Sequence, residues 1–266
     1  MKLFLALFKY NVKKTFQYRW SSLVSLVTDP LMLILFINLL TTVYSHNGSS
    51  SVLGYSLTQM IWYFGATKFF FYLVVCYTDR SLSDSIVSGS MVIKLIKPVP
   101  VIVMEFSEAA SSKMTTILYE FIPNFIIYSL LVPPSFMDTI SFTKYILLTM
   151  LAFVLFFLLS FLFGIIAFEW ENSGSFAEVK NFVLSILSGA AVPLEFFPGS
   201  IQAILKFLPF QYMFYVPIRI FLNMPETHSM AYFVNAMSML LIWIGILYVM
   251  SIVLWKRYSR HFSAVG

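Results

Sequence analysis

Two ionisable side chains lie in the interior of long apolar stretches of this sequence. Lys68 falls within 54–77 and Glu120 within 110–132, each several residues from either end. A charge at the centre of a lipid bilayer costs about 3 kcal/mol or more, so both side chains should face protein or a water-filled cavity. Because a helix rises about 1.5 Å per residue, the two lie at similar depths when measured from the same side. They either form an ion pair with each other or line a path across the membrane.

The motifs of the common catalytic and nucleotide-binding sites are absent from the sequence. There is no G-x-x-x-x-G-K-[ST] run, so the chain has no P-loop to hold nucleotide phosphates. H-E-x-x-H and G-x-S-x-G are absent too, and the three histidines fall in predicted loops or in the C-terminal tail. The single cysteine, Cys76, rules out an intramolecular disulfide and a C-x-x-C site. We therefore expect no catalytic residues, no bound metal and no cofactor in this chain, and we expect that it is not an enzyme.

The elements that position these residues are predicted to be membrane helices, as the composition indicates. Of the 266 residues, 59% are hydrophobic and 11% are charged, and the mean hydropathy is +0.85. About a quarter of the residues in soluble domains are charged, because such domains cannot hide this much apolar surface in their cores. A lipid bilayer covers that surface instead. The net charge of +5 follows from basic residues placed beside the membrane, so we expect lipids and not nucleic acid as partners.

Six membrane-spanning helices are predicted. A helix needs roughly 20 mostly apolar residues to cross the hydrocarbon core, and five segments stand out by this criterion. Basic residues at both ends of the chain place both termini in the cytoplasm, which requires an even number of crossings and therefore a sixth span. In the first span, Asp29 is predicted to cap a helix break, with Pro30 as the first residue beyond it. The predicted spans are 20–44, 54–77, 110–132, 145–168, 173–196 and 230–255, of which 173–196 is the one that parity requires.

The orientation follows from where the Lys and Arg residues gather. Twelve of the 17 lie in the N-terminal segment, in or beside the inner loop 78–108, or in the C-terminal tail, and three lie in outer segments. Such an excess marks the cytoplasmic side. The segment 1–19 is predicted to form an amphipathic helix on the inner membrane surface, since Lys2, Lys9 and Lys13 share one stripe. A cytosolic extension of the first span is the alternative for this segment.

The inner loop contains a predicted short helix at 81–87. Ser81 and Asp84 form an S-x-x-D capping box, and a glycine two residues beyond the helix supplies a left-handed stop. Such a helix would expose Leu82 and Ile86 on one face, toward a docking partner. The alternative is a connector that lies along the membrane surface.

The outer stretch 197–223 is apolar along its length but cannot form a straight span, because prolines interrupt it. Such a segment can dip into the membrane and return, as a re-entrant pair buried against the protein. The residues that mark this predicted re-entrant segment are Pro193, Phe196, Phe197, Pro198 and Pro209.

Short stretches of the sequence are similar to patterns of a known family. The stretch 188–198, SGAAVPLEFFP, resembles a Gly-Pro-Leu-x-Phe-Phe-Pro pattern where the fifth span runs into the outer loop. The stretch 208–210, LPF, resembles the Leu-Pro-Phe that follows, with Pro217 beyond it, and 93–98, IKLIKP, resembles a Leu-x-Lys-Pro stretch after a coupling helix. With the order of elements over essentially the whole chain, these features resemble the permease subunit of type 2 ATP-binding cassette (ABC) exporters, in a branch of small bacterial ABC-2-type permeases.

The resemblance implies an all-α permease domain over 1–266 in the plasma membrane of a bacterium. It implies two separate ATPase subunits that bind ATP and Mg, and a second permease that is identical or related. The residues that would contact an ATPase subunit are Ser81, Leu82, Asp84, Ile86 and Val87. The exported cargo would be hydrophobic or amphipathic, as a lipid, peptide, drug or glycoconjugate is.

Two other interpretations of the sequence stay open. One is an intramembrane enzyme such as a transferase, and the other is a channel or carrier that needs no ATPase. Against the enzyme stands the lack of a polar cluster at one membrane depth beyond Lys68 and Glu120. An ATPase subunit encoded beside this gene, or co-purifying with the protein, would separate the three interpretations.

Overall fold

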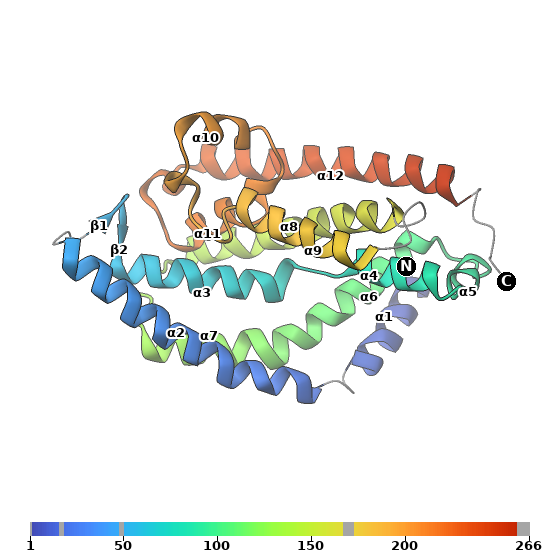
Figure 1. Ribbon diagram of the computed structural model, residues 1–266, viewed down its shortest axis with the longest axis horizontal. Coiled ribbons are helices and arrows are strands. Elements are labelled where there is room, and N and C mark those ends of the chain that lie inside the picture. Colours follow the sequence, from blue (N-terminus) through green and yellow to red (C-terminus); the bar gives the residue numbers. More distant parts are fainter. Residues whose placement is uncertain (1, 16–18, 48–50, 167–172, 260–266) are drawn as a thin grey trace.

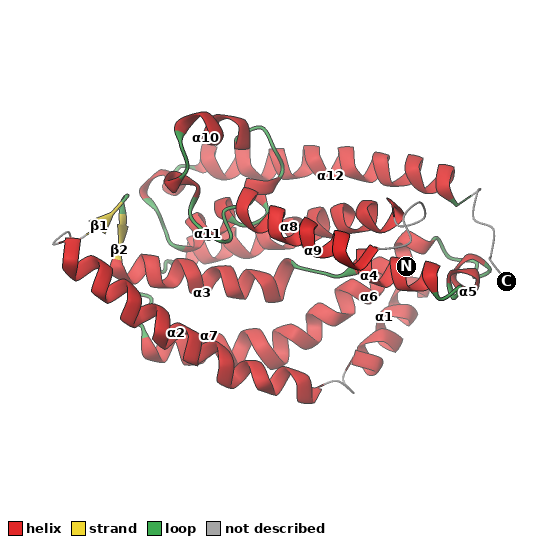
Figure 2. Cartoon of the chain, in the orientation of Figure 1, coloured by secondary structure: helices red, strands yellow, loops and turns green. Residues whose placement is uncertain are grey.

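Helices make up 81% of the chain in a computed structural model that describes residues 2–15, 19–47, 51–166 and 173–259 (Figures 1 and 2). The predicted all-α class is therefore confirmed. The elements in chain order are α1 (Lys2–Thr15), α2 (Arg19–Asn47), β1 (Ser51–Val52), β2 (Tyr55–Ser56), α3 (Leu57–Val74), α4 (Thr78–Val87), α5 (Met91–Leu95), α6 (Val101–Thr116), the π-helical turn η2 (Ile117–Phe121), α7 (Ile122–Leu131), α8 (Thr139–Ile166), α9 (Ser173–Leu187), η3 (Leu194–Phe196), α10 (Gly199–Leu205), η4 (Phe210–Tyr212), α11 (Tyr215–Phe221), η5 (Pro225–His228) and α12 (Met230–Tyr258).

Helix α8 forms the centre of the structure. It is apolar along most of its length and packs against α12, α4, α11 and α3. Figure 1 places α1, α4, α5 and the last turns of α12 at one end of the protein, here called the α4 end. The strands β1 and β2, with α10 and α11, lie toward the opposite end, here called the hairpin end (Figure 1). The long helices run between these two ends.

Four helices of the described chain are long and apolar enough to cross a membrane. They are Val24–His46 within α2, Val101–Leu131 over α6 to α7, Thr139–Ile166 and Met230–Tyr258. Helices α3 and α4 together form a fifth candidate, which is bent by 43° at their junction. The chain is accordingly a helical membrane protein.

The sixth predicted span, 173–196, corresponds to α9 and the turn after it. Helix α9 has 15 residues within the described chain and ends at Leu187, and Gly189 then takes a positive φ of 78°. A helix of this length covers about 22 Å, whereas the hydrocarbon core is about 30 Å thick. The six-span arrangement stays a prediction.

Helix α2 runs without a break through Asp29 and Pro30, so the predicted helix break is wrong. Pro30 has no N–H to bond to the preceding turn, yet the helix continues on both sides of it. The reason lies in what Asp29 contacts. Its carboxylate pairs with Lys68, and its backbone carbonyl accepts a hydrogen bond of 3.0 Å from the Tyr128 hydroxyl. The carboxylate that would cap a new helix is therefore engaged with α3.

Local signals fix the start of α3. Leu53 and Gly54 both have positive φ, at 50° and 84°, and turn β1 tightly into β2. Ser56 then caps the helix: its hydroxyl accepts a hydrogen bond of 3.2 Å from the Gln59 N–H. The Gln59 side chain accepts one of 3.1 Å from the Ser56 N–H, which completes a capping box.

The junction between α3 and α4 is held by Lys113 of α6. Its ammonium donates hydrogen bonds to the carbonyls of Tyr72, at 3.2 Å, and of Val75, where the end of α3 leaves oxygens without helical donors. Helix α4 then begins at Thr78, three residues before the predicted start. Ser81 consequently lies within the helix and makes no capping hydrogen bond to it, so the predicted capping box is wrong.

The turn η2 joins α6 to α7 within one long helix. It stands just before Pro123, which has no N–H for the carbonyl of Tyr119. Glu120 lies in this wider turn and is half-buried. Helix α1 packs against α6, where Lys14 pairs with Glu108 at 3.1 Å. Of the predicted helix 1–19, the structure has a helix over Lys2–Thr15, whereas Arg19 begins α2 and residues 1 and 16–18 lie outside the described residues. Its place on a membrane surface stays a prediction.

Candidate functional site

Helix α4 turns its apolar face into the protein. Leu82 is 0% exposed and lies against Gly164 of α8. A Cβ atom at Gly164 would lie 2.8 Å from Cδ1 of Leu82 and 3.0 Å from Cα of Asp79, so only glycine permits this approach. The prediction that Leu82 points outward is wrong, and Ile86 is half-buried as well. The apolar spacing that fits a partner fits a groove on α8 equally well.

A buried ion pair joins α4 to α9. Lys180 donates a hydrogen bond of 2.6 Å to Asp79, and the two side chains are 1% and 5% exposed. Lys180 also donates to the Ser160 hydroxyl of α8 at 3.3 Å, and it lies over the rings of Phe156 and Phe163. The second oxygen of Asp79 has no hydrogen-bond partner among the described residues. One buried charge pair therefore ties three helices together.

Sequence order does not reveal this pair. In the sequence, Lys180 is only a charge that lowers the hydropathy of the predicted fifth span, and Asp79 lies 101 residues away. The usable signal is that a lysine inside a membrane helix requires an acidic partner. Five acidic residues of the inner loop and third span are candidates for that partner, and the topology alone does not choose among them.

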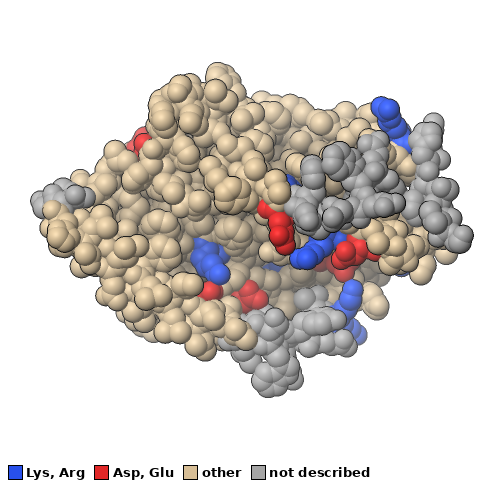
Figure 3. Space-filling view, viewed as in Figure 1, with Lys and Arg blue, Asp and Glu red and all other residues tan. Residues whose placement is uncertain are grey.

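The opposite face of α4 is exposed. Arg80, Asp84 and Val87 lie three or four residues apart and are exposed, with Val87 at 69%. We call these three residues the docking face. Beside it lies a cavity of about 520 Å³ lined by charged and hydroxyl side chains, among them the half-buried Ser81. In Figure 3 most of the charged side chains on the visible face lie toward the α4 end.

The short helix α5 braces the docking face. Lys94 of α5 donates hydrogen bonds to Ser85 of α4 at 2.8 Å and to the buried Glu105 of α6 at 2.6 Å. Next to it, Ile93 and Ile96 are exposed apolar side chains at the α4 end.

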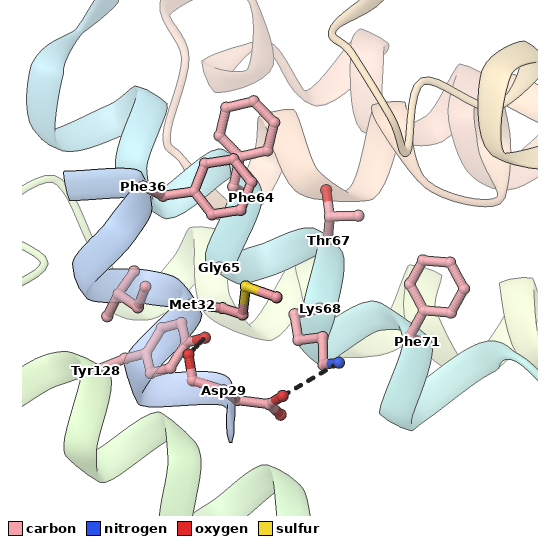
Figure 4. Close-up of a pocket in the computed structure, with 10 residues that line it drawn as sticks. Asp29, Met32, Phe36, Phe64, Gly65, Thr67, Lys68, Phe71 and Tyr128 are labelled. Atoms are coloured by element: carbon pink, nitrogen blue, oxygen red, sulfur yellow. Dashed lines mark hydrogen bonds and ion pairs between the residues drawn. The ribbon is translucent and has the colours of Figure 1, made fainter. Parts of the chain in front are cut away.

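A second candidate site lies between α2 and α3, where Lys68 and Asp29 form an ion pair of 3.2 Å (Figure 4). Lys68 lines a cavity of about 260 Å³, in agreement with the prediction that it faces protein or a cavity. Its ion-pair partner is Asp29 and not the predicted Glu120. Equal depth in the membrane leaves the rotation of each helix about its axis undetermined, and this rotation decides which carboxylate faces Lys68.

The walls of this α2–α3 pocket are apolar. Met32 and Phe36 come from α2, and Phe64 and Phe71 come from α3. The rings of Phe36 and Phe64 stack with centroids 4.8 Å apart and 14° between their planes. Figure 4 shows these two rings at one end of the pocket and the ion pair at the other. The pocket thus has an apolar part and a charged part.

A third polar group lies at the hairpin end, beside the predicted re-entrant segment. Glu195 of η3 accepts hydrogen bonds from the hydroxyls of Tyr55, at 3.1 Å, and Tyr215, at 2.6 Å, and from Arg219. Arg219 also pairs with Glu226 of η5. We call these five residues the Glu195 cluster. Neither here nor elsewhere in the described chain do three His, Cys, Asp or Glu side chains lie close enough to hold a metal ion.

The residues predicted to mark the re-entrant segment shape it. Pro193, Pro198 and Pro209 each stand immediately before a short helix: η3, α10 and η4. Pro193 and Pro209 are buried, Phe197 is half-buried, and Phe196 and Pro198 are exposed. The sequence identified the prolines that interrupt helical structure here. It did not identify the Glu195 cluster, which links the short helices to one another. Entry of the segment into the membrane stays a prediction.

Comparison with known proteins relates these sites to a family. Residues 30–266 match a protein-family model described as ABC-2 family transporter protein. The matched range includes α4, Lys68 and the Glu195 cluster. Asp29 of the α2–α3 pocket lies one residue before the start of this range. No curated protein matches the chain.

Proposed function

We propose that this chain, which belongs to the ABC-2 family of transporter proteins, is the membrane permease subunit of an ATP-driven exporter. The observation that carries the proposal is the two-sided character of α4. One face is fixed to α8 and α9 through Leu82 and Asp79, and the other presents Arg80, Asp84 and Val87. A helix built in this way can receive a displacement from a docked partner and pass it to the membrane helices.

A continuous set of contacts leads from α4 toward the hairpin end. Helix α9 is tied to α4 through Lys180, and just beyond its other end the Ser188 carbonyl accepts a hydrogen bond of 3.1 Å from the Tyr215 N–H. The Gly189 carbonyl accepts one of 2.5 Å from the Tyr63 hydroxyl. Displacement of α4 would therefore act on α11 and on the Glu195 cluster as well.

The transport cycle would switch the helices between two arrangements, one that accepts cargo and one that releases it outward. A partner shifts such an equilibrium only by binding one state more tightly than the other. ATP-driven closure of two ATPase subunits on the docking face would supply that difference. The ATPase subunits would bind ATP and Mg, since this chain has no P-loop.

The remaining parts of the proposal concern the assembly. A second permease, identical or related, would complete the transporter in the plasma membrane of a bacterium. Both termini would be cytoplasmic, which the basic residues of the inner segments support. The cargo would be hydrophobic or amphipathic, as a lipid, peptide, drug or glycoconjugate is.

The test is co-expression of the permease with an ATPase subunit encoded beside its gene, followed by purification and measurement of ATP hydrolysis. Val87→Asp and Arg80→Glu alter the docking face without touching buried contacts. Both variants should insert normally and associate with the ATPase about ten-fold more weakly, as is typical of a changed interface hot spot. Stimulated hydrolysis should fall in parallel.

Two further variants separate docking from folding. Lys206→Glu, at the exposed residue just after α10, should change neither association nor hydrolysis. Leu82→Asp should instead reduce the amount of folded protein, because it places a charge in the buried contact with Gly164. Full association of the Val87→Asp variant would refute the docking face, and cargo transport by the permease without any ATPase would refute the exporter.

A further inference from the structure

The α2–α3 pocket opens on the apolar flank of the protein. Met32 and Phe71 both line it, and both are exposed, at 58% and 39%. Leu31 and Leu35, on either side of Met32 in α2, are exposed too. Because α2 is one of the candidate membrane spans, we expect this flank to face hydrocarbon. A molecule that enters the pocket therefore comes from the lipid phase, with an apolar part that remains outside.

The charge pair at the end of the pocket is incompletely satisfied. Lys68 has three N–H donors; its ammonium forms an ion pair of 3.2 Å with Asp29, and the ring of Tyr72 lies 5.7 Å away. The Lys68 side chain is 47% exposed, whereas that of Asp29 is 5% exposed. One carboxylate oxygen of Asp29 has no hydrogen-bond partner among the described residues. The exposed ammonium of Lys68 can donate to a ligand, and the free carboxylate oxygen of Asp29 can accept from one, so this pair has room for a ligand.

The net charge of the pair limits the head group that can bind. A lysine and an aspartate together carry no net charge. An anion or a cation alone would leave one uncompensated charge in an apolar slot, which is strongly unfavourable. A head that carries both an ammonium and an anionic group adds no net charge, donates to Asp29 and accepts from Lys68.

We propose that the α2–α3 pocket binds the cargo and that the cargo is a lipid-like amphiphile with such a zwitterionic head. That the bound molecule is transported rests on the proposed function, whereas the existence of the binding site does not. The cavity of about 260 Å³ holds the head and the first methylenes. The rest of the chain extends past Met32 and Phe71 into the bilayer.

The test uses the purified full-length permease in nonionic detergent and three single-chain probes of equal chain length. Lysophosphatidylethanolamine carries an ammonium and a phosphate, lysophosphatidylglycerol carries the phosphate alone, and hexadecylamine carries the ammonium alone. Binding is measured by native mass spectrometry over a titration of each probe. The wild type should bind the zwitterionic probe at least about ten-fold more tightly than either singly charged probe. Each singly charged probe adds one charge to the pocket that has no counter-charge there.

Single substitutions should exchange the preference in opposite directions. Asp29→Asn leaves a lone cation in the pocket, so the phosphate-only probe should become the tightest ligand. Lys68→Gln leaves a lone anion, so the ammonium-only probe should become the tightest. The exchanged pair, Asp29→Lys with Lys68→Asp, should restore the preference for the zwitterion. A merely structural role of the ion pair would change stability without this reversal.

Two more variants keep the test decisive when a charge variant fails to fold. Met32→Trp fills the mouth of the pocket without altering the ion pair of Lys68 and Asp29. It should lower the affinity for all three probes to a similar level. Lys144→Gln removes a lysine charge from α8 outside the pocket and should leave the order of the probes unchanged. Equal binding of the three probes by the wild type would overturn the proposal, as would a Met32→Trp variant that binds like the wild type. Equal binding is also the result expected if a second permease covers the slot.

These outcomes are independent of the exporter assignment. Probe binding is measured on the permease alone, so it needs no ATPase. Should the preferences reverse as stated while no ATPase associates, the site stands and the proposed function fails. Should ATPase-dependent transport be found while the probes bind alike, the function stands and the site is wrong.

Discussion

Lys180 and Asp79 meet at 2.6 Å across the interface of α9 and α4, although 101 residues separate them along the chain. Both side chains are almost fully buried, and Ser160 of α8 completes the contact. The helix at the start of the predicted inner loop is thereby fixed to the helical bundle. The contact packs α4 against α8 and α9.

Removal of one member of this pair should be more harmful than removal of both. Lys180→Met and Asp79→Asn each leave an uncompensated buried charge or an unsatisfied polar group, at a cost of about 3–5 kcal/mol in the free energy of unfolding. The double variant should recover about 2 kcal/mol of that loss. Unfolding in detergent, followed by circular dichroism against temperature or denaturant, measures the difference.

The exposed pair Lys14 and Glu108 provides the control for this cycle. Their side chains are 53% and 45% exposed, so Glu108→Gln should change stability by about 1 kcal/mol or less. Additive losses for Lys180→Met and Asp79→Asn would show that the two residues act independently, contrary to the contact described above.

Gly164 should tolerate no side chain. A Cβ atom there would press on Leu82 and on the backbone at Asp79, so Gly164→Ala should destabilise the protein by about 1–3 kcal/mol. Leu82→Ala in the same chain should relieve only part of the clash, because the backbone contact remains. Gly245→Ala in α12 is the matched control: nothing lies within 4 Å of its added methyl, so it should be neutral or stabilising by up to about 1 kcal/mol. Equal stability of the two glycine variants would contradict the close packing of α4 on α8.

Glu195 should hold the hairpin end together. Glu195→Ala removes the acceptor of two tyrosine hydroxyls and one of two carboxylates beside Arg219, which should cost about 1.5–3 kcal/mol. Tyr55→Phe removes one of these hydrogen bonds and should cost about 1 kcal/mol. Lys206→Gln, on the exposed surface nearby, should stay within about 0.5 kcal/mol. Hydrogen exchange measured by mass spectrometry should place the loss of protection in β2, η3 and α11, and uniform loss over the whole chain would argue against a local role.

Opposite ends of the protein should be labelled from opposite sides of the membrane. The single native cysteine, Cys76, is buried, so the background should be low. On intact cells a membrane-impermeant maleimide should label Lys206→Cys, just after α10, and should spare Arg80→Cys on α4 until the cells are opened. Labelling of both from the same side would exclude the orientation predicted from the basic residues.

Hydropathy located two of the long helices to within three residues: 230–255 corresponds to Met230–Tyr258 and 20–44 to Arg19–Asn47, because the cost of polar groups in lipid acts on each segment separately. The starts of two others were less accurate, since Val101–Leu131 begins nine residues before the predicted 110–132 and Thr139–Ile166 six residues before 145–168. Local capping chemistry was less informative. The S-x-x-D box predicted a helix start at Ser81, yet the contacts of Asp79 and Leu82 with α8 and α9 place the start three residues earlier.

Pairing between helices was beyond the reach of sequence reasoning. Depth predicted that Lys68 would meet a carboxylate, and depth alone chose Glu120, whereas the packing of α2 on α3 brings Asp29 to it. Lys113 illustrates the same limit. It counted as a basic residue of the inner side, and the structure uses it to satisfy carbonyls at the end of α3. Such roles depend on helix rotation, which composition and spacing do not determine.

The π-helical turn Ile117–Phe121 takes up one more residue than an α-helical turn would, so α7 continues α6 with almost unchanged rotation. That rotation brings Tyr128 to the Asp29 carbonyl and to the ring of Phe69, 4.9 Å from its own. Deletion of one residue within the turn, such as the exposed Leu118, would let the chain close into a regular α-helix and leave Tyr128 close to its present place. The same deletion in the regular part of α6 would rotate everything beyond it by about 100° and carry Tyr128 away from both contacts. The wide turn is therefore a place where this long helix can lose a residue without losing the pocket wall.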